Sequence, residues 1–237
     1  MAWHELGAAG DRPVILIHGL FSNALVNWVR YGHAAKLVAK GRRVIMPDLR
    51  AHGSSGKPHD RSHYPPDVLA LDGEALVAHL ALNDYDLGGY SMGARTCVRL
   101  VARGATPNRL ILGGMGIEGI VDAGKRSDHF RHILENLGTF ERGSDKWMVE
   151  AFLKTTKGDP RALLPLLGSF VDTPRAAIEA IGQPTLVVAG EEDDDNGSAD
   201  DLARLLPNGR YVAVPGGHMS AVTRPDLGRA MANFLAA

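Results

Sequence analysis

The sequence predicts an α/β fold in which a mostly parallel sheet carries helices on both faces. Short, uninterrupted runs of apolar and β-branched residues are typical of strands that are buried on both faces. Stretches with helical spacing separate these runs, which is the pattern of a parallel α/β sheet. Polar, glycine-containing loops follow the runs, and such sheets bind ligands beyond the carboxyl ends of their strands. We therefore expect one core with a site on one rim of the sheet.

The expected elements follow one another along the chain. A glycine or proline closes several of them, as Gly41, Pro47 and Gly104 do. The expected strands cover residues 14–17, 44–46, a short segment before Ser91, 110–112, 185–189 and 211–214. The expected helices cover residues 24–39, 67–80, 92–103 and a last segment that carries Leu227, Met231 and Phe234.

Residues 115–173 show no buried strand pattern, and we expect them to form a helical cap over the rim. From Phe130, apolar residues recur at the spacing of one helix face. Pro165 is expected to kink or end the helix that begins at Pro160. The alternative is a set of further peripheral core helices, but the segment is long for a crossover. The predicted division is a core of residues 1–114 and 174–237 and a cap of residues 115–173.

The bulk composition is that of an ordinary globular protein. The chain has 237 residues, a hydrophobic content of 45% and a net charge of −1, so no overall field favours nucleic acid or an anionic membrane. No apolar run approaches the roughly 20 residues of a membrane span. The single cysteine fits a reducing compartment, and the start shows no signal-peptide pattern. We therefore expect a cytoplasmic protein with a small-molecule substrate, and the sequence does not indicate its oligomeric state.

A G-x-S-x-G motif stands at Gly89, Ser91 and Gly93. A serine on a tight strand-to-helix turn projects its hydroxyl away from the backbone, and flanking glycines avoid collisions in so sharp a turn. The following helix places its N-terminus beside the serine, which favours a developing negative charge. Ser91 is therefore the candidate nucleophile. The alternative is a glycine-rich loop with an incidental serine.

A serine nucleophile needs a base, and the base needs an orienting group. Among ten histidines, only His18 and His218 directly follow an expected buried strand. His218 follows a Gly216-Gly217 turn that leaves its imidazole free to reach the rim, so we take it as the general base. The alternative is a histidine in a surface loop.

The orienting carboxylate is expected on the loop after the strand at residues 185–189. That loop carries five consecutive acidic residues at 191–195. Like charges this close repel one another, so most of the run should be solvated and one carboxylate turned inward. We assign Asp193 to this role, with Asp195 and Asp194 as alternatives.

The order Ser91, Asp193, His218 is the order of α/β-hydrolase triads. The chain resembles α/β-hydrolases of the capped esterase, haloperoxidase and C–C hydrolase type, over nearly all of its length outside residues 115–173. The motifs that carry the resemblance are His18-Gly19, Asp48-Leu49-Arg50-Ala51-His52-Gly53-Ser54-Ser55, Gly89-Tyr90-Ser91-Met92-Gly93, Gly190-Glu191-Glu192-Asp193 and Gly216-Gly217-His218.

The resemblance implies an oxyanion hole made by the backbone amides of Leu20 and Met92, with Phe21 as the alternative to Leu20. The chain departs from the family pattern at Ala51, where relatives often have glycine, and in the extra aspartates of the acid loop. A serine at position 91 argues against the haloalkane dehalogenase and epoxide hydrolase reactions, which use a carboxylate there.

The substrate is expected to meet residues of the rim and of the cap. We expect His18, Gly19, Phe21 and Tyr90 near the serine and Trp147 from the cap, where Phe130, Met148 and Phe152 are also available. These apolar residues indicate a partly hydrophobic substrate. The sequence does not tell which cap residues face inward.

Three further patterns are weak. Gly114-x-Gly116-x-x-Gly119 matches a dinucleotide fingerprint, but no strand with a terminal acidic residue follows at the required distance. The run from Glu192 resembles a calcium loop but has Ala203 at the twelfth position. His52, His59 and His63 match no tight metal motif and fit a solvated or cap-lining loop. We therefore expect neither a cofactor nor a metal ion.

The residues together indicate a serine hydrolase that cleaves a small, partly hydrophobic ester through an acyl-enzyme. Ser91 attacks, His218 moves the proton and Asp193 holds the imidazole. Two alternatives remain open. One is a C–C bond hydrolase that acts on diketone-like substrates with the same triad, and the other is a receptor on the same scaffold that binds a ligand without turnover.

Overall fold

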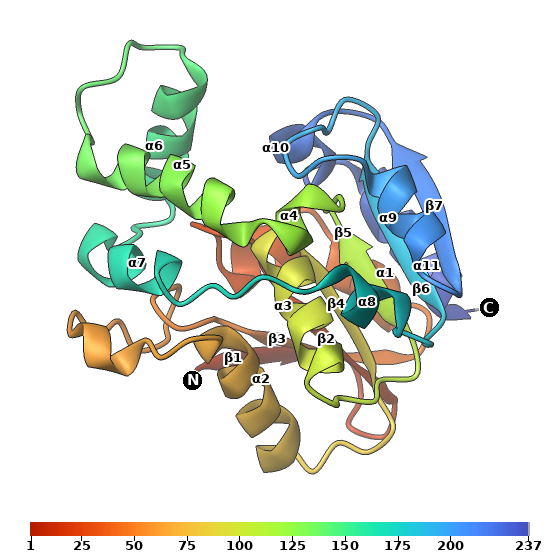
Figure 1. The fold of residues 1–237 in the computed structure, drawn as a ribbon. Coiled ribbons are helices and arrows are strands. Elements are labelled where there is room, and N and C mark those ends of the chain that lie inside the picture. Colours follow the sequence, from red (N-terminus) through yellow and green to blue (C-terminus); the bar gives the residue numbers. More distant parts are fainter. Residues whose placement is uncertain (237) are drawn as a thin grey trace.

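A computed structural model describes residues 1–236 and places one seven-stranded sheet at the centre of the protein (Figure 1). The strand order is β1-β3-β2-β4-β5-β6-β7. All neighbouring strands are parallel except β1, which pairs antiparallel with β3. The predicted α/β class with a mostly parallel sheet is confirmed. The strands are β1 (Trp3–Leu6), β2 (Arg12–Ile17), β3 (Arg42–Pro47), β4 (Asp86–Tyr90), β5 (Leu110–Gly113), β6 (Thr185–Gly190) and β7 (Gly209–Val214).

The central strands are the apolar runs of the sequence. Every residue of β4, β5 and β6 is buried, as expected for strands covered by helices on both faces. The edge strand β1 was not predicted. Its four residues are mostly exposed and contain no apolar run, so the sequence carries no strand signal there.

Helices cover both faces of the sheet (Figure 1). Leu69 of α2, Val98 of α3 and Leu202 of α9 belong to the apolar cluster on one face. Leu37 of α1 and Met231 of α11 belong to the cluster on the other face. The helices are η1 (Leu25–Val29), α1 (His33–Val38), η2 (Arg61–His63), α2 (Val68–His79), α3 (Met92–Ala102), α4 (Glu118–Val121), α5 (Ala123–Glu135), α6 (Asp145–Thr155), α7 (Pro160–Leu167), α8 (Arg175–Glu179), α9 (Ala199–Leu205), α10 (His218–Ala221) and α11 (Pro225–Ala236).

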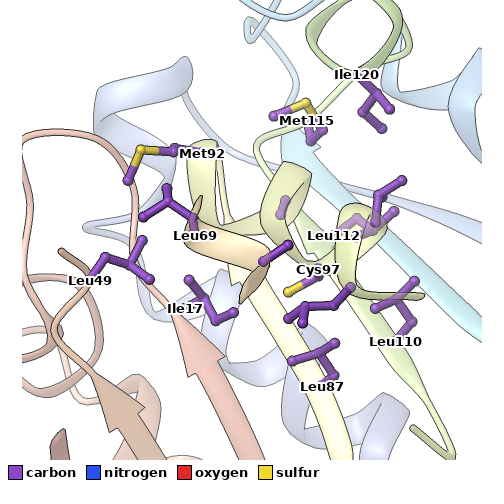
Figure 2. Packing of buried hydrophobic residues seen from close by; sticks show 14 of the residues in the cluster. Ile17, Leu49, Leu69, Leu87, Met92, Cys97, Leu110, Leu112, Met115 and Ile120 are labelled. Carbon is purple, nitrogen blue, oxygen red and sulfur yellow. The ribbon is translucent and has the colours of Figure 1, made fainter. Parts of the chain in front are cut away.

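The first cluster lies directly beneath the G-x-S-x-G turn. Figure 2 shows Ile17 and Leu87 on the sheet together with Met92 and Cys97 on α3. All four side chains are at most 4% exposed. Burying an Ile, Leu or Met side chain in this way stabilises the fold by about 1.5–3 kcal/mol. The helix that begins after Ser91 is therefore held firmly against the sheet.

The helix expected at residues 24–39 is two elements. A π-helical turn, η1, is followed by α1, and Gly32 separates them with φ +74°. A left-handed residue cannot continue a right-handed helix, so the prediction of one helix was wrong.

Helices α4, α5, α6 and α7 fall within residues 115–173, and α5, α6 and α7 project to one side of the sheet (Figure 1). Pro165 lies inside α7, which ends two residues later at Leu167. No strand interrupts this segment among the described residues. The helical character of residues 115–173 is confirmed, whereas the division into core and cap domains stays a prediction.

Candidate active site

Ser91 occupies a strained turn between β4 and α3. Its backbone has φ +55° and ψ −119°, a conformation that costs energy for a residue with a side chain. A Cβ on Gly89 would overlap the backbone of Gly93, and a Cβ on Gly93 would overlap the backbone of Ile17. Both glycines of the motif are therefore required by the close approach of the backbone.

The structure brings Ser91, His218 and Asp193 together. His218 Nε2 lies 3.0 Å from Ser91 Oγ. His218 Nδ1 lies 2.9 Å and 3.1 Å from the two carboxylate oxygens of Asp193. An ionised carboxylate can only accept, so Nδ1–H donates to Asp193 and Nε2 is left to accept from the serine hydroxyl. This is the geometry in which an imidazole can take a proton from a hydroxyl.

The other aspartates of the acid loop have different places. The Asp193 side chain is 2% exposed, whereas Asp194 and Asp195 are exposed. Asp195 forms an ion pair with Arg126 of α5, at 2.6 Å. Among residues 1–236, only Asp193 of the three is hydrogen-bonded to His218, so the geometry favours it as the orienting group.

Tyr90 links the serine turn to the histidine loop. Its hydroxyl donates to the backbone carbonyl of His218 at 2.6 Å, and its ring lies 5.4 Å from the imidazole. Burial raises the pKa of Tyr90 well above its ordinary value, so the phenol stays protonated and remains a donor. The expectation that Tyr90 lies at the site thus acquires a structural reason.

The backbone amides of the loop after β2 differ in whether they already donate a hydrogen bond within the protein. Gly19 N–H donates to Asn27 Oδ1 at 3.1 Å, and Phe21 N–H donates to His52 Nε2 at 3.2 Å. Within residues 1–236, the amides of Leu20 and Met92 donate to no other group. Leu20, and not Phe21, therefore has an amide available for an oxyanion, together with Met92 at the start of α3.

Two buried histidines support this loop from below. His18 donates from Nδ1 to the carbonyl of Gly19 at 2.8 Å and accepts the Leu49 amide at Nε2, at 3.0 Å. His52 donates from Nδ1 to the carbonyl of Arg50 at 2.9 Å. Burial lowers the pKa of His18 to about 4 and that of His52 to about 3. Both imidazoles are therefore neutral at pH 7 and carry one N–H each. Since Nε2 accepts a backbone amide in both rings, that N–H is at Nδ1.

Of the three histidines expected in a solvated or cap-lining loop, His59 and His63 are exposed, whereas His52 is buried and hydrogen-bonded, so it is not solvated. The same loop contains Asp48, which accepts the amides of Ala24 at 2.9 Å and Ser54 at 2.7 Å. Burial opposes ionisation of Asp48, but these hydrogen bonds outweigh it and lower its pKa. Ala51 has φ +68°, the conformation that favours glycine, so the loop keeps this left-handed turn despite the substitution.

A cavity of about 150 Å³ opens beside Ser91. Its wall contains polar groups but no Asp, Glu, Lys or Arg among the described residues. The lining residues are Gly19, Leu20, Ser22, Val26, Asn27, Tyr31, Tyr90, Ser91, Phe152, His218, Met219, Val222 and Thr223.

The cavity includes some of the expected substrate-binding residues and omits others. Gly19 and Tyr90 line it, whereas His18 and Phe21 lie buried beneath the rim and do not. Trp147 is also absent from its wall, and α6 contributes Phe152 instead. Five residues along a helix turn the side chain by about 140°, so the two aromatic residues face different directions. Asn27 was missed, because the π-helical turn that positions it has no sequence signal.

The weak sequence patterns have steric explanations. A Cβ on Gly116 would overlap the backbone of Gly197, and a Cβ on Gly119 would approach Met115 and Asn196. The glycines of this motif thus permit close packing against the acid loop. Within residues 1–236, no group of three or more His, Cys, Asp or Glu side chains is placed to hold a metal ion.

None of the helices in the described part of the chain is long and apolar enough to cross a membrane.

The comparisons define the class of protein. Residues 12–137 match the family model described as "alpha/beta hydrolase fold", and the chain belongs to this family. The resemblance noted in the sequence is thereby confirmed. A protein named as a hydrolase and one named as a haloperoxidase are among its relatives, and an esterase from Thermogutta terrifontis shares the fold.

Two relatives and one solved structure illustrate the kinds of protein to which the chain is similar. The chain is 31% identical to the dihydrolipoyllysine-residue acetyltransferase component of the acetoin cleaving system of Pseudomonas putida, over 92% of this chain and 62% of that protein. It therefore spans less than two thirds of that relative. It is 26% identical to the 3-hydroxybutyrate-oligomer hydrolase of Cupriavidus necator, over 97% and 87%. The enol-lactonase of Burkholderia xenovorans shares the fold, with a TM-score of 0.80, 22% identity and coverage of 100% and 96%.

Proposed function

We propose that the protein is a serine hydrolase that cleaves small, neutral, partly hydrophobic carboxylic esters. The observation that carries the proposal is the continuous relay from Ser91 Oγ through His218 to Asp193, with distances of 3.0 and 2.9 Å, at the wall of a cavity. The family and its hydrolase-named members support the same class of reaction.

The proposed reaction begins when Ser91 Oγ attacks the ester carbonyl carbon and His218 Nε2 takes the hydroxyl proton. Asp193 holds the imidazole and stabilises its positive charge. The carbonyl oxygen becomes an oxyanion that accepts the amides of Leu20 and Met92. His218 then protonates the leaving alcohol, and an acyl-enzyme remains. A water molecule attacks the acyl group with the same base, and the acid product leaves.

The cavity supports the size and charge of the proposed substrate. A volume of about 150 Å³ is that of a cavity able to hold benzene, so it fits an acyl or alcohol group of about six heavy atoms. The apolar side chains of Val26, Phe152 and Met219 favour a hydrophobic group there. The lack of lining Asp, Glu, Lys and Arg side chains, in the described residues, favours an uncharged substrate.

Short-chain nitrophenyl esters and a fluorophosphonate probe test this proposal. We expect turnover of acetyl to hexanoyl esters to exceed that of dodecanoyl esters, and the probe to label Ser91. The Ser91→Ala variant should lose the probe adduct and lower kcat by more than about 10⁴-fold. Ser62→Ala is the matched control, since Ser62 is an exposed serine outside the cavity.

A wider panel separates the alternatives. It contains a diketone for C–C cleavage, an enol-lactone, and a 3-hydroxybutyrate dimer, the last two suggested by the names of relatives. Ester turnover by Ser91→Ala equal to that of the parent would end the proposal. Faster turnover of the diketone than of any ester would favour C–C hydrolysis, and tight binding without turnover or labelling would favour the receptor.

A further inference from the structure

Two aspartates of the acidic run at residues 191–195 have different partners. Asp193 turns inward to His218, at 2.9 Å. Asp195 turns to the opposite side and pairs with Arg126 of α5, at 2.6 Å. The loop that carries the orienting carboxylate is therefore tied to a helix of the 115–173 segment two residues away from that carboxylate.

The same helix contacts the other side of the site. Phe130 of α5 packs edge to face against Phe21, with ring centroids 5.4 Å apart and an interplanar angle of 88°. Phe21 directly follows Leu20, and its backbone is held at φ +62°. The guanidinium of Arg126 lies 4.9 Å from the Phe130 ring centroid, so the two side chains of α5 also contact each other.

The end of the acid loop is attached to the start of the same segment. Asn196 Nδ2 donates to the carbonyl of Gly114 at 3.0 Å, and the carbonyl of Asn196 accepts the amide of Gly119 at 3.0 Å. Asn196 is buried, so these bonds are shielded from water. The loop thus has a fixed end at Asn196, and the Arg126–Asp195 pair lies between that end and Asp193.

We propose that Arg126 and Phe130 are positioning residues, and that α5 fixes the position of the acid loop (residues 191–195) relative to the loop that carries the Leu20 amide (residues 18–22). Arg126 acts through Asp195 on Asp193, and Phe130 acts through Phe21 on the Leu20 amide. A displacement of α5 disturbs both loops at once, so the proposed hydrolysis is fastest while α5 keeps both contacts. The proposal deepens the ester hydrolase function and rests on it for its kinetic readouts.

The kinetic test compares Arg126→Gln and Phe130→Ala with Arg229→Gln. Arg229 forms an exposed ion pair with Asp226 on α11, so its loss controls for removal of a surface charge. We expect Arg126→Gln to lower kcat about threefold to fivefold and Phe130→Ala about threefold to tenfold, with KM within about twofold of the parent. Phe130→Leu, which keeps an apolar contact, should recover part of the loss, and Arg229→Gln should match the parent.

Two signatures distinguish positioning from a general loss of stability. The Arg126–Asp195 pair is partly exposed, so about 1 M salt should lower kcat in the parent and leave Arg126→Gln unaffected. The Arg126→Gln/Asp195→Asn double variant should lose no more activity than either single variant, because each single substitution already removes the same Arg126–Asp195 ion pair. Additive losses, or equal salt responses, would overturn the proposal.

Amide hydrogen exchange makes the test independent of turnover. Arg126→Gln should speed exchange at residues 193–195, and Phe130→Ala should speed it at residues 20–22, with global stability unchanged in urea. If the parent fails to label with fluorophosphonate yet these exchange effects appear, the hydrolase assignment fails and the coupling stands. If labelling succeeds and neither loop changes its exchange, the coupling fails alone.

Discussion

The two sides of the candidate site are built by different means. The oxyanion side, comprising residues 18–22 and 48–55, is held by buried groups such as His18, His52 and Asp48, whose bonds are shielded from water. The acid side, residues 191–198, is mostly exposed and carries five consecutive charges. Its hydrogen bonds and ion pairs reach partners outside the loop, among them His218, Arg126 and Gly114.

Substitutions on the two sides should therefore differ in how they affect stability and activity. Changes on the oxyanion side leave buried polar groups unpaired, which costs stability as well as activity. Changes on the acid side mostly alter exposed groups, which cost little stability unless the one inward carboxylate is touched. The three predictions below test this contrast, in order of decreasing expected effect.

The largest effect is expected for Asp193→Asn on the acid side. The amide cannot hold the His218 tautomer that leaves Nε2 as an acceptor, so kcat should fall about 10⁴-fold in ester hydrolysis. Asp194→Asn is the matched control one residue away, because Asp194 is exposed and its carboxylate has no hydrogen bond or ion pair among residues 1–236. The control should retain the parental kcat, and its free energy of unfolding should lie within about 0.5 kcal/mol of that of the parent. Equal losses in both variants would contradict the contrast.

The oxyanion side should respond to acid through its two buried histidines. Burial lowers the pKa of His18 to about 4 and of His52 to about 3, whereas the unfolded chain binds these protons near pH 6.5. Their stabilising contribution is therefore present above pH 6.5 and is lost as the pH falls toward 4. The loss should reach roughly 3 kcal/mol per histidine at pH 4.

Urea unfolding between pH 7 and pH 4 measures this loss. His52→Gln, which removes one titrating group, should be less stable than the parent at pH 7 and should lose roughly 3 kcal/mol less on acidification. A curve parallel to that of the parent would show that His52 is not held neutral by the fold.

The smallest effect is expected at Asn27, whose Oδ1 accepts a hydrogen bond of 3.1 Å from the Gly19 amide in the loop beside Ser91. Asn27→Ala leaves that amide unpaired and loosens the Leu20 turn, so kcat/KM should fall about tenfold. Asn23→Ala is the comparison variant, because Asn23 caps the Val26 amide in the same segment but does not line the cavity. Steady-state kinetics with a butanoyl ester measures both. A larger loss for Asn23→Ala would contradict the role given to Asn27.

Much of the fold could be predicted because local patterns report burial. The runs that became β2, β5 and β6 are continuously apolar, which is the direct consequence of cover on both faces. The edge strand β1 and the break at Gly32 escaped notice for the converse reason. An exposed strand needs no apolar run, and one glycine among helix-forming residues gives little signal.

The candidate site divides in the same way. Ser91 and His218 could be predicted because the G-x-S-x-G turn and the strand ends mark them locally, whereas five adjacent carboxylates left Asp194 and Asp195 open beside Asp193. The buried state of His52, the pairing of Asp195 with Arg126 and the place of Phe152 depend on contacts between distant segments. Residue type and spacing carry no information on such contacts, so these features needed coordinates.

Cys97, the single cysteine of the sequence, is buried in α3, and burial raises the pKa of its thiol well above the ordinary value. Maleimide dyes react with thiolates, so the native protein should resist them. A Met148→Cys substitution on the exposed surface of α6 would give a single labelling point without any prior removal of native thiols. A fluorophore attached there would let the seating of the helical segment be followed optically while substrate is consumed.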